Sequence, residues 1–470
     1  MNPPLQLDDS DRERLWRRLI EVIEDYAENV DRGRVTPDLD PQAIRGMLAS
    51  CDFQQPCDPV AALEFAADSL RRYQTHTPHA RYFGLFNPAP ATMGIAADAL
   101  AAAFNPQLAA WSHSPFAIEA ERHLIRAIGE KFGYSRESVD GTFASGGAEA
   151  NHTAVLAAIS SEFPRFAAKG VRGLTAQPVF YASAESHHSL LRAGRLCGLG
   201  TEALRSIAVD SRLRMIPAAL AAQIQRDREA GLRPFLIAAT AGTTNAGAID
   251  PLPEIAAIAK NEKLWFHVDA AWGGAIALVP KMRPLLAGIE RADSITFDAH
   301  KWLSVPMGAG IFLTRHPEIL GQTFRIETAY MPREALDLDV VDPHLHSVQW
   351  SRRFIGLKLF LTLLTAGWKG YASAIRHQTA MGELLKRELI ASGWTVENDS
   401  PLPVVCFSDP AGGDPYRIAM LVVSAGEAWI STTIIGGPKT VLRACITNFR
   451  TQAEDIHALI ASLEDARRRV

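Results

Sequence analysis

The sequence predicts an α/β protein whose largest part is a mostly parallel sheet covered by helices, followed by a smaller α+β domain. Two observations predict this class. Between about residues 88 and 317, short apolar runs rich in β-branched residues alternate with Ala- and Leu-rich helical stretches, as in βαβ units. Beyond about residue 376, helices and strands alternate at shorter intervals. The strands expected in the large sheet are Pro178–Ala182, Pro234–Thr240, Leu264–Val268, Ser294–Phe297 and Gly310–Thr314.

The other expected elements lie on either side of that sheet region. Apolar residues from Leu15 to Val30 recur at three- and four-residue steps with charged residues opposite them, which predicts an amphipathic helix. A long helix is expected from about Ser351 to Ala366. The stretch Thr328–His346 contains many Asp and Pro residues without periodicity and predicts a long loop, which in compact enzymes is usually functional. The strands expected near the C-terminus are Val404–Ser408, Trp429–Ile434 and Val441–Thr447.

This order of elements divides the chain into three expected parts. They are an N-terminal helical segment at residues 1–87, a large domain at residues 88–375 and a small domain at residues 376–470. Of the 470 residues, 47% are hydrophobic and 21% are charged, values that are ordinary for a globular protein.

Charge and composition exclude several classes of protein. The net charge of −4, without any block of like charges, argues against binding to nucleic acid or to an acidic membrane surface. No apolar run approaches the roughly 18 residues of a membrane span. The five cysteines are scattered without a CxxC pair, so we expect neither a disulfide framework nor a metal site. The polar and acidic start, Met1–Ser10, resembles neither a secretory signal nor a transit peptide, and we expect a cytoplasmic protein with reduced thiols.

A lysine follows the expected strand that ends at Phe297. In the run Asp298-Ala299-His300-Lys301-Trp302, the lysine is flanked by His and Trp, a poor setting for a solvated surface charge. Lysine forms Schiff bases with aldehydes, and desolvation lowers its pKa enough to make it reactive. The alternative is a structural lysine that extends from the strand end into solvent.

A carboxylate follows another expected strand, in the run His267-Val268-Asp269-Ala270-Ala271. An Asp in this position is suited to pair with a protonated ring nitrogen of a cofactor, and Ala271 is small enough for a flat ring to lie against it. The alternative is an Asp that only caps the following turn.

Three further motifs contain candidate ligand-binding residues. The glycines of Ser145-Gly146-Gly147-Ala148 open a helix, where free backbone N–H groups favour a phosphate, although such a pair is often only a turn. His187 and His188 follow the strand that ends at Ala182, and a histidine there is suited to stack on a ring or to transfer a proton, or is only structural. Thr243 lies in a run that is also compatible with a simple polar turn.

The combination of these motifs is more specific than any one of them. An anion site, a stacking His, an Asp for a ring nitrogen and an amine for an aldehyde occur in this order, each at the end of a strand or the start of a helix. Pyridoxal 5′-phosphate requires this set of groups. The sequence therefore predicts that this compound is the cofactor.

The same motifs resemble those of the group II pyridoxal-phosphate-dependent decarboxylases, the family of aromatic-L-amino-acid, tyrosine, histidine and glutamate decarboxylases. The resemblance covers nearly the whole chain. It implies the aspartate-aminotransferase-like architecture (fold type I), with residues 88–375 as the cofactor-binding domain, and a homodimer with the active site at its interface. The motifs that support it outside the cofactor site are His79-Ala80-Arg81-Tyr82-Phe83-Gly84, Trp111-Ser112-His113-Ser114-Pro115 and Leu442-Arg443-Ala444-Cys445-Ile446-Thr447-Asn448.

The resemblance assigns a role to each candidate residue around the cofactor ring. Lys301 is implied to bind the cofactor aldehyde, and Asp269 to keep the pyridine nitrogen protonated. His187 and Ala271 are implied to lie on the two faces of the ring. Thr243 is implied to lie near the cofactor or the substrate carboxylate.

The phosphate and the substrate carbon also receive implied partners. Gly146, Gly147 and Ala148 are implied to bind the phosphate through their backbone amides, with assistance from His300. Tyr330, on the expected long loop, matches the tyrosine with which family members protonate the substrate carbon after carbon dioxide leaves.

The residues that match the substrate pocket of the family point to a particular substrate class. Leu85 and Ala109 occupy positions where aromatic-specific members tend to have aromatic rings, while Phe86 retains one. No basic cluster is evident that would select an acidic side chain. We therefore expect decarboxylation of an aromatic or large apolar L-amino acid to its amine. The alternatives are oxidative deamination to an aldehyde, which Tyr330 argues against, a carbon–carbon lyase of the same fold, and a non-catalytic partner-binding relative, which the retained site residues argue against.

Overall fold

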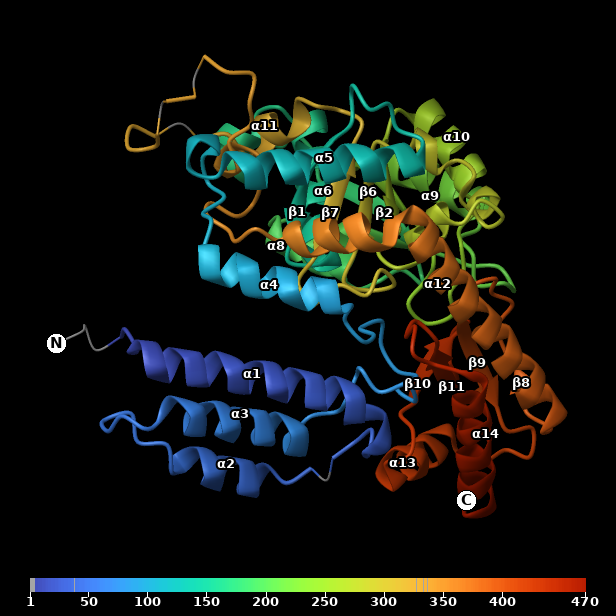
Figure 1. The fold of residues 1–470 in the computed structure, drawn as a ribbon. Coiled ribbons are helices and arrows are strands. Elements are labelled where there is room, and N and C mark those ends of the chain that lie inside the picture. Colours follow the sequence, from blue (N-terminus) through green and yellow to red (C-terminus); the bar gives the residue numbers. More distant parts are fainter. Residues whose placement is uncertain (1–4, 38, 327, 333, 336) are drawn as a thin grey trace.

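A seven-stranded mixed sheet forms the centre of the larger part of the described chain, in the order β1-β7-β6-β5-β4-β2-β3 (Figure 1). The computed structural model describes residues 5–37, 39–326, 328–332, 334–335 and 337–470. Strands β6, β5, β4, β2 and β3 are parallel to one another, whereas β7 is antiparallel to both β1 and β6. The strands are β1 (Asp140–Ala144), β2 (Pro178–Ser183), β3 (Leu204–Ile207), β4 (Arg233–Thr240), β5 (Trp265–Asp269), β6 (Ser294–Asp298) and β7 (Gly310–Thr314).

Helices cover both faces of this sheet, as the predicted α/β class requires. One face packs against α5, α9 and α10, and the other packs against α6, α8 and α11. All five strands expected from the sequence are present, and the fold class is confirmed. The helices are α5 (Pro115–Phe132), α6 (Gly147–Glu162), α7 (Phe166–Lys169), α8 (Ser189–Leu196), α9 (Pro217–Glu229), α10 (Leu252–Glu262) and α11 (Ile319–Phe324).

A second, smaller sheet lies near the C-terminus. In the part of the chain that the structure describes, it has four antiparallel strands in the order β10-β11-β9-β8, and the helices α13 and α14 pack against it. Its elements are β8 (Thr395–Val396), β9 (Val404–Ser408), α13 (Pro415–Ala425), β10 (Ser431–Ile435), β11 (Lys439–Cys445) and α14 (Ala453–Arg468).

Helix α12 (Leu357–Ala391) joins the two sheets, because it contacts α5 of the larger part and β8, β9 and α14 of the smaller one. The sequence-based start at Ser351 is wrong. The segment before Leu357 is not helical, and a buried ion pair holds Arg352 to Glu121, with 2.9 Å between Nη1 and Oε1. The helix also continues beyond Ala366, across a kink at Gly367. The expected boundary between residues 375 and 376 falls inside α12, so this division of the chain stays a prediction.

The N-terminal helices α1 (Asp9–Asn29), α2 (Pro41–Ala49) and α3 (Pro59–Tyr73) form a separate layer below α4 (Thr92–Phe104) in Figure 1. The expected amphipathic helix is α1, which packs on α3. None of the three helices contains a fully buried residue.

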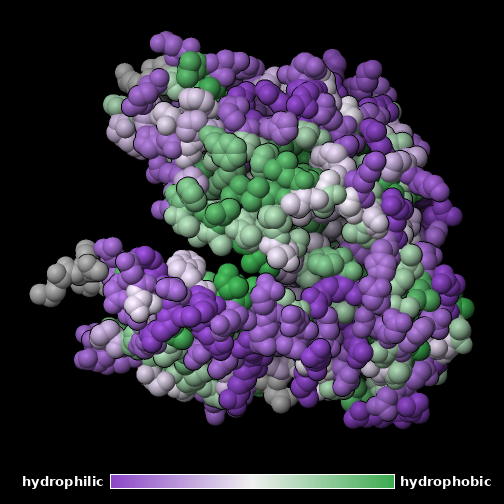
Figure 2. Space-filling model, viewed as in Figure 1, coloured by the Kyte–Doolittle hydropathy of each residue, from purple (hydrophilic) through white to green (hydrophobic). Residues whose placement is uncertain are grey.

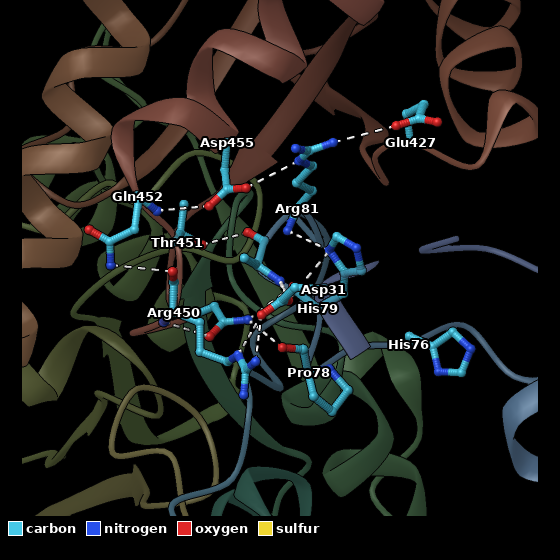
Figure 3. Close-up of polar contacts among 12 residues, drawn as sticks. Asp31, His76, Pro78, His79, Arg81, Glu427, Arg450, Thr451, Gln452 and Asp455 are labelled. Atoms are coloured by element: carbon cyan, nitrogen blue, oxygen red, sulfur yellow. Dashed lines mark hydrogen bonds and ion pairs between the residues drawn. The ribbon is translucent and has the colours of Figure 1, made fainter. Parts of the chain in front are cut away.

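A polar cluster attaches this layer to the C-terminal part of the chain (Figure 3). The Nε of Arg450 donates to Oδ2 of Asp31 at 2.9 Å, and the hydroxyl of Thr451 donates to the carbonyl of Ala80 at 2.7 Å. The N-terminal layer is thus anchored at one end, while its helices extend away from the sheets.

The expected long loop is observed between α11 and α12, in the described part of residues 328–346, with one short helical turn at Pro343–Leu345. Figure 1 shows that it protrudes from the larger part. None of the helices in the described residues is both long and apolar enough to cross a membrane.

Candidate active site

The sequence motifs converge at one edge of the large sheet. Strands β2, β5 and β6 are parallel, and β1 runs in the same direction as β6 because both are antiparallel to β7. The residues just after these strands therefore lie at the same sheet edge, where ligands bind in α/β folds. The glycines before α6 follow β1, His187 follows β2, Asp269 ends β5 and Lys301 follows β6.

The amine of Lys301 lies between a carboxylate and an aromatic ring. Its Nζ is 3.0 Å from Oδ2 of Asp298 and 5.8 Å from the ring centroid of Phe86. Asp298 is buried, whereas the Lys301 side chain is 24% exposed. The amine is thus held in place yet open to an incoming aldehyde.

The carboxylate of Asp269 is buried and fixed through both oxygens. Oδ1 accepts a hydrogen bond from the backbone N–H of Ala271 at 3.1 Å, and Oδ2 accepts one from Nδ2 of Asn151 at 2.8 Å. These two donors fix the orientation of the carboxylate, which is suited to accept a charge-assisted hydrogen bond from a protonated ring nitrogen.

The N-terminus of α6 approaches the same region. A side chain at Gly147 would place its Cβ 2.7 Å from Oδ2 of Asp298 and 3.4 Å from Cβ of Ala271, so only glycine fits there without a shift. A Cβ at Gly146 would lie 3.6 Å from Cε1 of His300. Among the described residues no side chain caps α6, and Ala148 in its first turn is exposed, so the first backbone N–H groups are open to an anion.

His300 is suited to donate a hydrogen bond beside these glycines. Burial lowers the pKa of His300, which favours the neutral ring. Its Nδ1 accepts the backbone N–H of Ala309 at 3.2 Å, which assigns the ring proton to Nε2. That N–H points away from the bond to Ala309 and remains available to a ligand.

His187 and Thr243 differ in how exposed their side chains are. The His187 ring is exposed, and its Nδ1 lies 2.8 Å from the hydroxyl oxygen of Ser189, which fixes one edge of the ring and leaves a face open. Thr243 is fully buried, and its hydroxyl oxygen accepts the backbone N–H of Ala248 at 3.0 Å. Thr243 thus closes a turn beside the site.

Three predicted residues have no hydrogen bond, ion pair or ring contact with Lys301 among the described residues. Tyr330 is 73% exposed on the protruding loop, and its ring neighbour is Trp350, with 6.4 Å between centroids. No hydrogen bond, ion pair or ring contact joins it to Lys301 within the described residues. Leu85 is 56% exposed, and the carbonyl of buried Ala109 accepts the backbone N–H of His344.

Phe86, in contrast, forms one wall of the site. Its ring stacks on Trp272 with 4.5 Å between centroids. The guanidinium carbon of Arg443 lies 5.1 Å from the same Phe86 ring, close to the 5.8 Å of the Lys301 amine. The Phe86 ring therefore lies beside both cations.

Sequence reasoning missed Arg443 and Asn151. Arg443 is buried on β11; Nη1 donates to the carbonyl of Gly84 at 2.9 Å, while Nη2 has no hydrogen-bond partner in the part of the chain described. Asn151 lies in α6, one turn after Gly147, and bonds to Asp269. Only the family-like run around Arg443 offered a signal, and Asn151 is inconspicuous in a helix of Ala and Leu.

The arrangement fits pyridoxal 5′-phosphate. It provides an amine for the aldehyde, an ionised carboxylate for the ring nitrogen and a helix N-terminus for the phosphate. Both carboxylate oxygens of buried Asp298 lack a hydrogen-bond partner among the described residues, so the Lys301 ammonium and a bound ligand or water must satisfy them. No group of His, Cys, Asp and Glu side chains in the described residues is arranged to hold a metal ion.

These features define an enzyme that uses pyridoxal phosphate, and comparison with known proteins specifies the family. A family model described as the pyridoxal-dependent decarboxylase conserved domain matches residues 47–409. The aromatic-L-amino-acid decarboxylase of Bacillus atrophaeus is 30% identical over 476 aligned residues, covering 99% of this chain and 97% of that protein. An acidic amino acid decarboxylase of Xenopus tropicalis is 32% identical over 354 residues, covering 74% of this chain and 68% of that protein.

A solved structure agrees over the whole length. The crystal structure of Oryza sativa TDC with PLP and tryptamine has a TM-score of 0.93 and 25% sequence identity, and covers 100% of this chain and 99% of that chain. The chain belongs to the pyridoxal-dependent decarboxylase family. It is a pyridoxal-phosphate-dependent amino-acid decarboxylase, and the predicted family, enzyme class and cofactor are confirmed. Its relatives include both aromatic and acidic amino acid decarboxylases.

Proposed function

We propose that this enzyme converts an aromatic or large apolar L-amino acid to the corresponding amine and carbon dioxide. The observation that carries the proposal is the Phe86 ring, which lies 5.8 Å from the amine of Lys301 and is supported from behind by the buried ring of Trp272. Aromatic and large apolar side chains pack favourably on such a ring, whereas an acidic side chain would lose hydration there and compete with the substrate α-carboxylate for Arg443, the nearby guanidinium. The relative that matches 99% of the chain is an aromatic-L-amino-acid decarboxylase, which further supports this class.

Arg443 is the group best suited to the substrate α-carboxylate. Its buried guanidinium keeps Nη2 unpaired within the described residues, and leaving a buried charged donor unpaired is costly. A carboxylate beside the Phe86 ring would satisfy this donor with a charge-assisted bond. In this proposal Arg443 binds the α-carboxylate of the substrate and so orients the amino acid, and it does not recognise the substrate side chain.

The residues that would hold the cofactor act around this substrate. Lys301 would bind its aldehyde, Asp269 its ring nitrogen and the N-terminal amides of α6, with His300, its phosphate, while His187 and Ala271 would cover the ring faces. When bound, pyridoxal phosphate supplies an electron sink for the pair released when the Cα–carboxylate bond breaks. The stacked Phe86 and Trp272 rings limit water near the carboxylate and so favour its departure as neutral carbon dioxide.

Tyr330 is the proposed acid that returns a proton to Cα. A phenol hydroxyl held within hydrogen-bond reach can deliver this proton, and a loop that carries it also excludes water. Because Tyr330 lies exposed on the protruding loop, it has to reach an active site by loop closure or from a second copy of the chain. The competing outcome is oxidation by dioxygen to an aldehyde, which becomes favourable when the proton is not delivered.

A panel of L-amino acids tests the substrate class. Purified enzyme with added pyridoxal phosphate is incubated with aromatic, aliphatic and acidic L-amino acids, and carbon dioxide, amine, aldehyde and peroxide are quantified. We expect equal amounts of carbon dioxide and amine from an aromatic or large apolar substrate. Turnover restricted to acidic amino acids would overturn the proposed class, and carbon dioxide without amine would indicate the oxidative reaction.

The variant Tyr330→Phe tests the proton donor in the same assay. We expect amine formation to fall at least about a hundredfold, the usual contribution of a general acid, while aldehyde becomes the main product. Trp350→Phe is a matched control, because it keeps an aromatic neighbour for Tyr330 without changing the phenol. An unchanged amine yield in Tyr330→Phe would remove Tyr330 from the mechanism.

The assembly proposed for this enzyme is a homodimer. Figure 2 shows apolar side chains gathered on the face formed over α4, α5 and α12, above the N-terminal layer. Phe104, Phe116 and Leu364 on these helices are 81%, 67% and 68% exposed. An apolar groove of about 450 Å³ lies between α1, α3 and the start of α4.

A second copy of the chain would cover both surfaces. The helices α1 and α3 bury no residue completely, and Trp16 and Ile20 of α1 are more than half exposed, so the N-terminal layer is itself short of a packing partner. Reciprocal packing of this layer on the partner's α4, α5 and α12 would cover the apolar surfaces of both copies in one closed, two-fold contact.

A further inference from the structure

A chain of hydrogen-bonded side chains runs beneath the active site. It connects Trp265 and Ser294, at the starts of β5 and β6, with Asp269 and His187 at the sheet edge where the ligand site lies. Its first part runs from Trp265 to Asn151: 2.9 Å separate Trp265 Nε1 from Ser294 Oγ, 2.9 Å separate Ser294 Oγ from His267 Nδ1, and 3.0 Å separate His267 Nε2 from Asn151 Oδ1. From Asn151 Nδ2 the network branches to Asp269 Oδ2 and to Ser189 Oγ, each at 2.8 Å. Ser189 Oγ in turn lies 2.8 Å from His187 Nδ1.

The hydrogen bonds in this network can be assigned donors and acceptors in one consistent way. The indole of Trp265 can only donate, so the Ser294 hydroxyl oxygen accepts from it and keeps its own hydrogen and a second lone pair for the contact with Nδ1 of His267. Oδ1 of Asn151 can only accept, so Nε2 of His267 carries the ring proton and donates to it, and Nδ1 of the neutral ring accepts from the Ser294 hydroxyl. The Thr296 hydroxyl lies farther from this Nε2, at 3.5 Å. Burial lowers the pKa of His267 to about 4, in agreement with a neutral ring.

The hydrogen bonds at Asp269 and His187 agree with this assignment of donors and acceptors. Ionised Asp269 can only accept, so the amide nitrogen of Asn151 faces it, and the second amide hydrogen points to Oγ of Ser189. The Ser189 hydroxyl then donates to Nδ1 of His187, which the Ser189 backbone N–H also approaches at 3.2 Å. His187 is thereby assigned a proton on Nε2.

Asn151 is the branch point of this network. It is buried in α6, about one helical turn beyond the N-terminus that faces the phosphate position, and its amide bonds to both arms. We propose that Asn151 is a positioning residue that holds Asp269 as an oriented carboxylate and His187 in its Nε2–H form, so that one amide prepares the site for the cofactor ring. This inference rests on the proposed roles of Asp269 and His187.

Two substitutions of Asn151 separate positioning from packing. Asn151→Leu removes both donated bonds. Asn151→Asp keeps the shape but places a second carboxylate 2.8 Å from where Asp269 accepts, so the two acids share a proton when the pH is lowered. Thr153→Val is the matched control, because Thr153 is buried in the same helix and its hydroxyl bonds to the carbonyl of Glu149, at 3.0 Å, and to no other described residue.

The measurement is the affinity of the cofactor-free enzyme for pyridoxal phosphate, followed by quenching of tryptophan fluorescence between pH 5.5 and 8, with each variant expressed as a ratio to wild type. We expect Asn151→Leu to weaken binding by about tenfold or more at every pH, the loss expected for a charge-assisted bond. Asn151→Asp should show a similar loss at pH 8 and recover toward wild type at pH 5.5, because the protonated acid again donates to Asp269. Thr153→Val should remain within about twofold of wild type.

Each possible result decides the proposal. Affinities of both Asn151 variants within about twofold of wild type, or a deficit of Asn151→Asp that does not change with pH, would overturn it. If Asn151→Leu does not fold, the pH dependence of Asn151→Asp alone decides. No amino acid is present in the experiment, so an error in the proposed substrate would leave its result unaffected.

Discussion

Lys301 shows at the scale of one residue how the fold prepares a reactive amine. The side chain lies between the carboxylate of Asp298 and the ring of Phe86 and is only partly exposed. We predict that Lys301→Ala abolishes amine formation and, after treatment with borohydride, retains no covalently bound cofactor. Lys281→Ala, at an exposed position, is the control and should match wild type. Turnover of Lys301→Ala near the wild-type rate, by the amine assay, would refute the assigned role.

A second residue-scale prediction concerns stability in acid. Burial lowers the pKa of His267 in the folded protein to about 4, from an ordinary value of 6.5. Between these two values the unfolded chain binds a proton that the folded chain does not, so the free energy of unfolding decreases as the pH falls. A shift of this size corresponds to a loss of roughly 3 kcal/mol by pH 4.

Urea unfolding of the cofactor-free protein at several pH values between 4 and 7.5 measures this loss. His267→Gln lacks the titrating group, so its stability should depend less on pH than that of wild type over this range. Parallel curves for the two proteins would show that His267 does not contribute to the acid sensitivity.

The site was predictable only where residues of a motif are neighbours in the chain. Lys301, Asp269 and the glycines before α6 each stand beside a strand or helix end that the sequence pattern reveals. Asn151 and His267 are joined at 3.0 Å although 116 positions separate them, and no local pattern indicates such a pair. Arg443 was overlooked for the same reason, since its partners Gly84 and Phe86 lie in the N-terminal part of the chain.

At the scale of elements, the strands predicted for the large sheet are the buried ones. Strands β4, β5, β6 and β7 are buried along nearly their whole length, and such strands have a clear apolar pattern. The missed strands β1 and β3 are the edge strands of the large sheet and contain polar or exposed residues, and the missed strand β8 has only two residues. The predicted start of α12 is too early because Arg352 forms an ion pair with Glu121, which is distant in the sequence, and lies in a segment that is not helical.

The kink of α12 leads to a prediction at this scale. Gly367 has φ 61° and ψ 174°, a backbone conformation that is almost restricted to glycine. No atom of the described residues lies within 4 Å of the position that a Cβ would occupy, so Gly367→Ala should act through backbone strain and not through a clash. We predict a loss of about 1–3 kcal/mol in the free energy of unfolding.

Urea unfolding checks this value against Gly46→Ala. Gly46 lies in helix α2 without a positive φ, and its Cβ position is also open, so alanine there should leave stability unchanged or raise it by up to about 1 kcal/mol. Equal effects of the two substitutions would mean that α12 straightens at Gly367 without strain.

At the scale of the whole molecule, the main expectations came from the order of the motifs along the chain. The sheet edge that collects the carboxyl ends of β2, β5 and β6 brings the groups of the cofactor site together, and this consequence of parallel strands is independent of loop detail. No comparable general rule predicts where the N-terminal layer lies. It depends on polar contacts such as Arg450 with Asp31, and on surfaces that a single chain leaves uncovered.

These uncovered surfaces give the last prediction. If two copies pack through the apolar face over α4, α5 and α12, the wild-type protein should sediment with the mass of two chains at micromolar concentration. Phe104→Glu places a charge on this face, where 81% of the residue is exposed in one chain, and should raise the dissociation constant at least about tenfold because the charge would be desolvated in the dimer. Ile390→Glu, near the C-terminal end of α12, adds the same charge at a residue that is 63% exposed and should leave the dimer intact.

The activity of these variants tests whether the loop of Tyr330 serves the partner's site. If it does, activity should fall in proportion to the fraction of dimer. A wild-type protein that is fully active as a monomer would contradict both the dimer and this use of the loop.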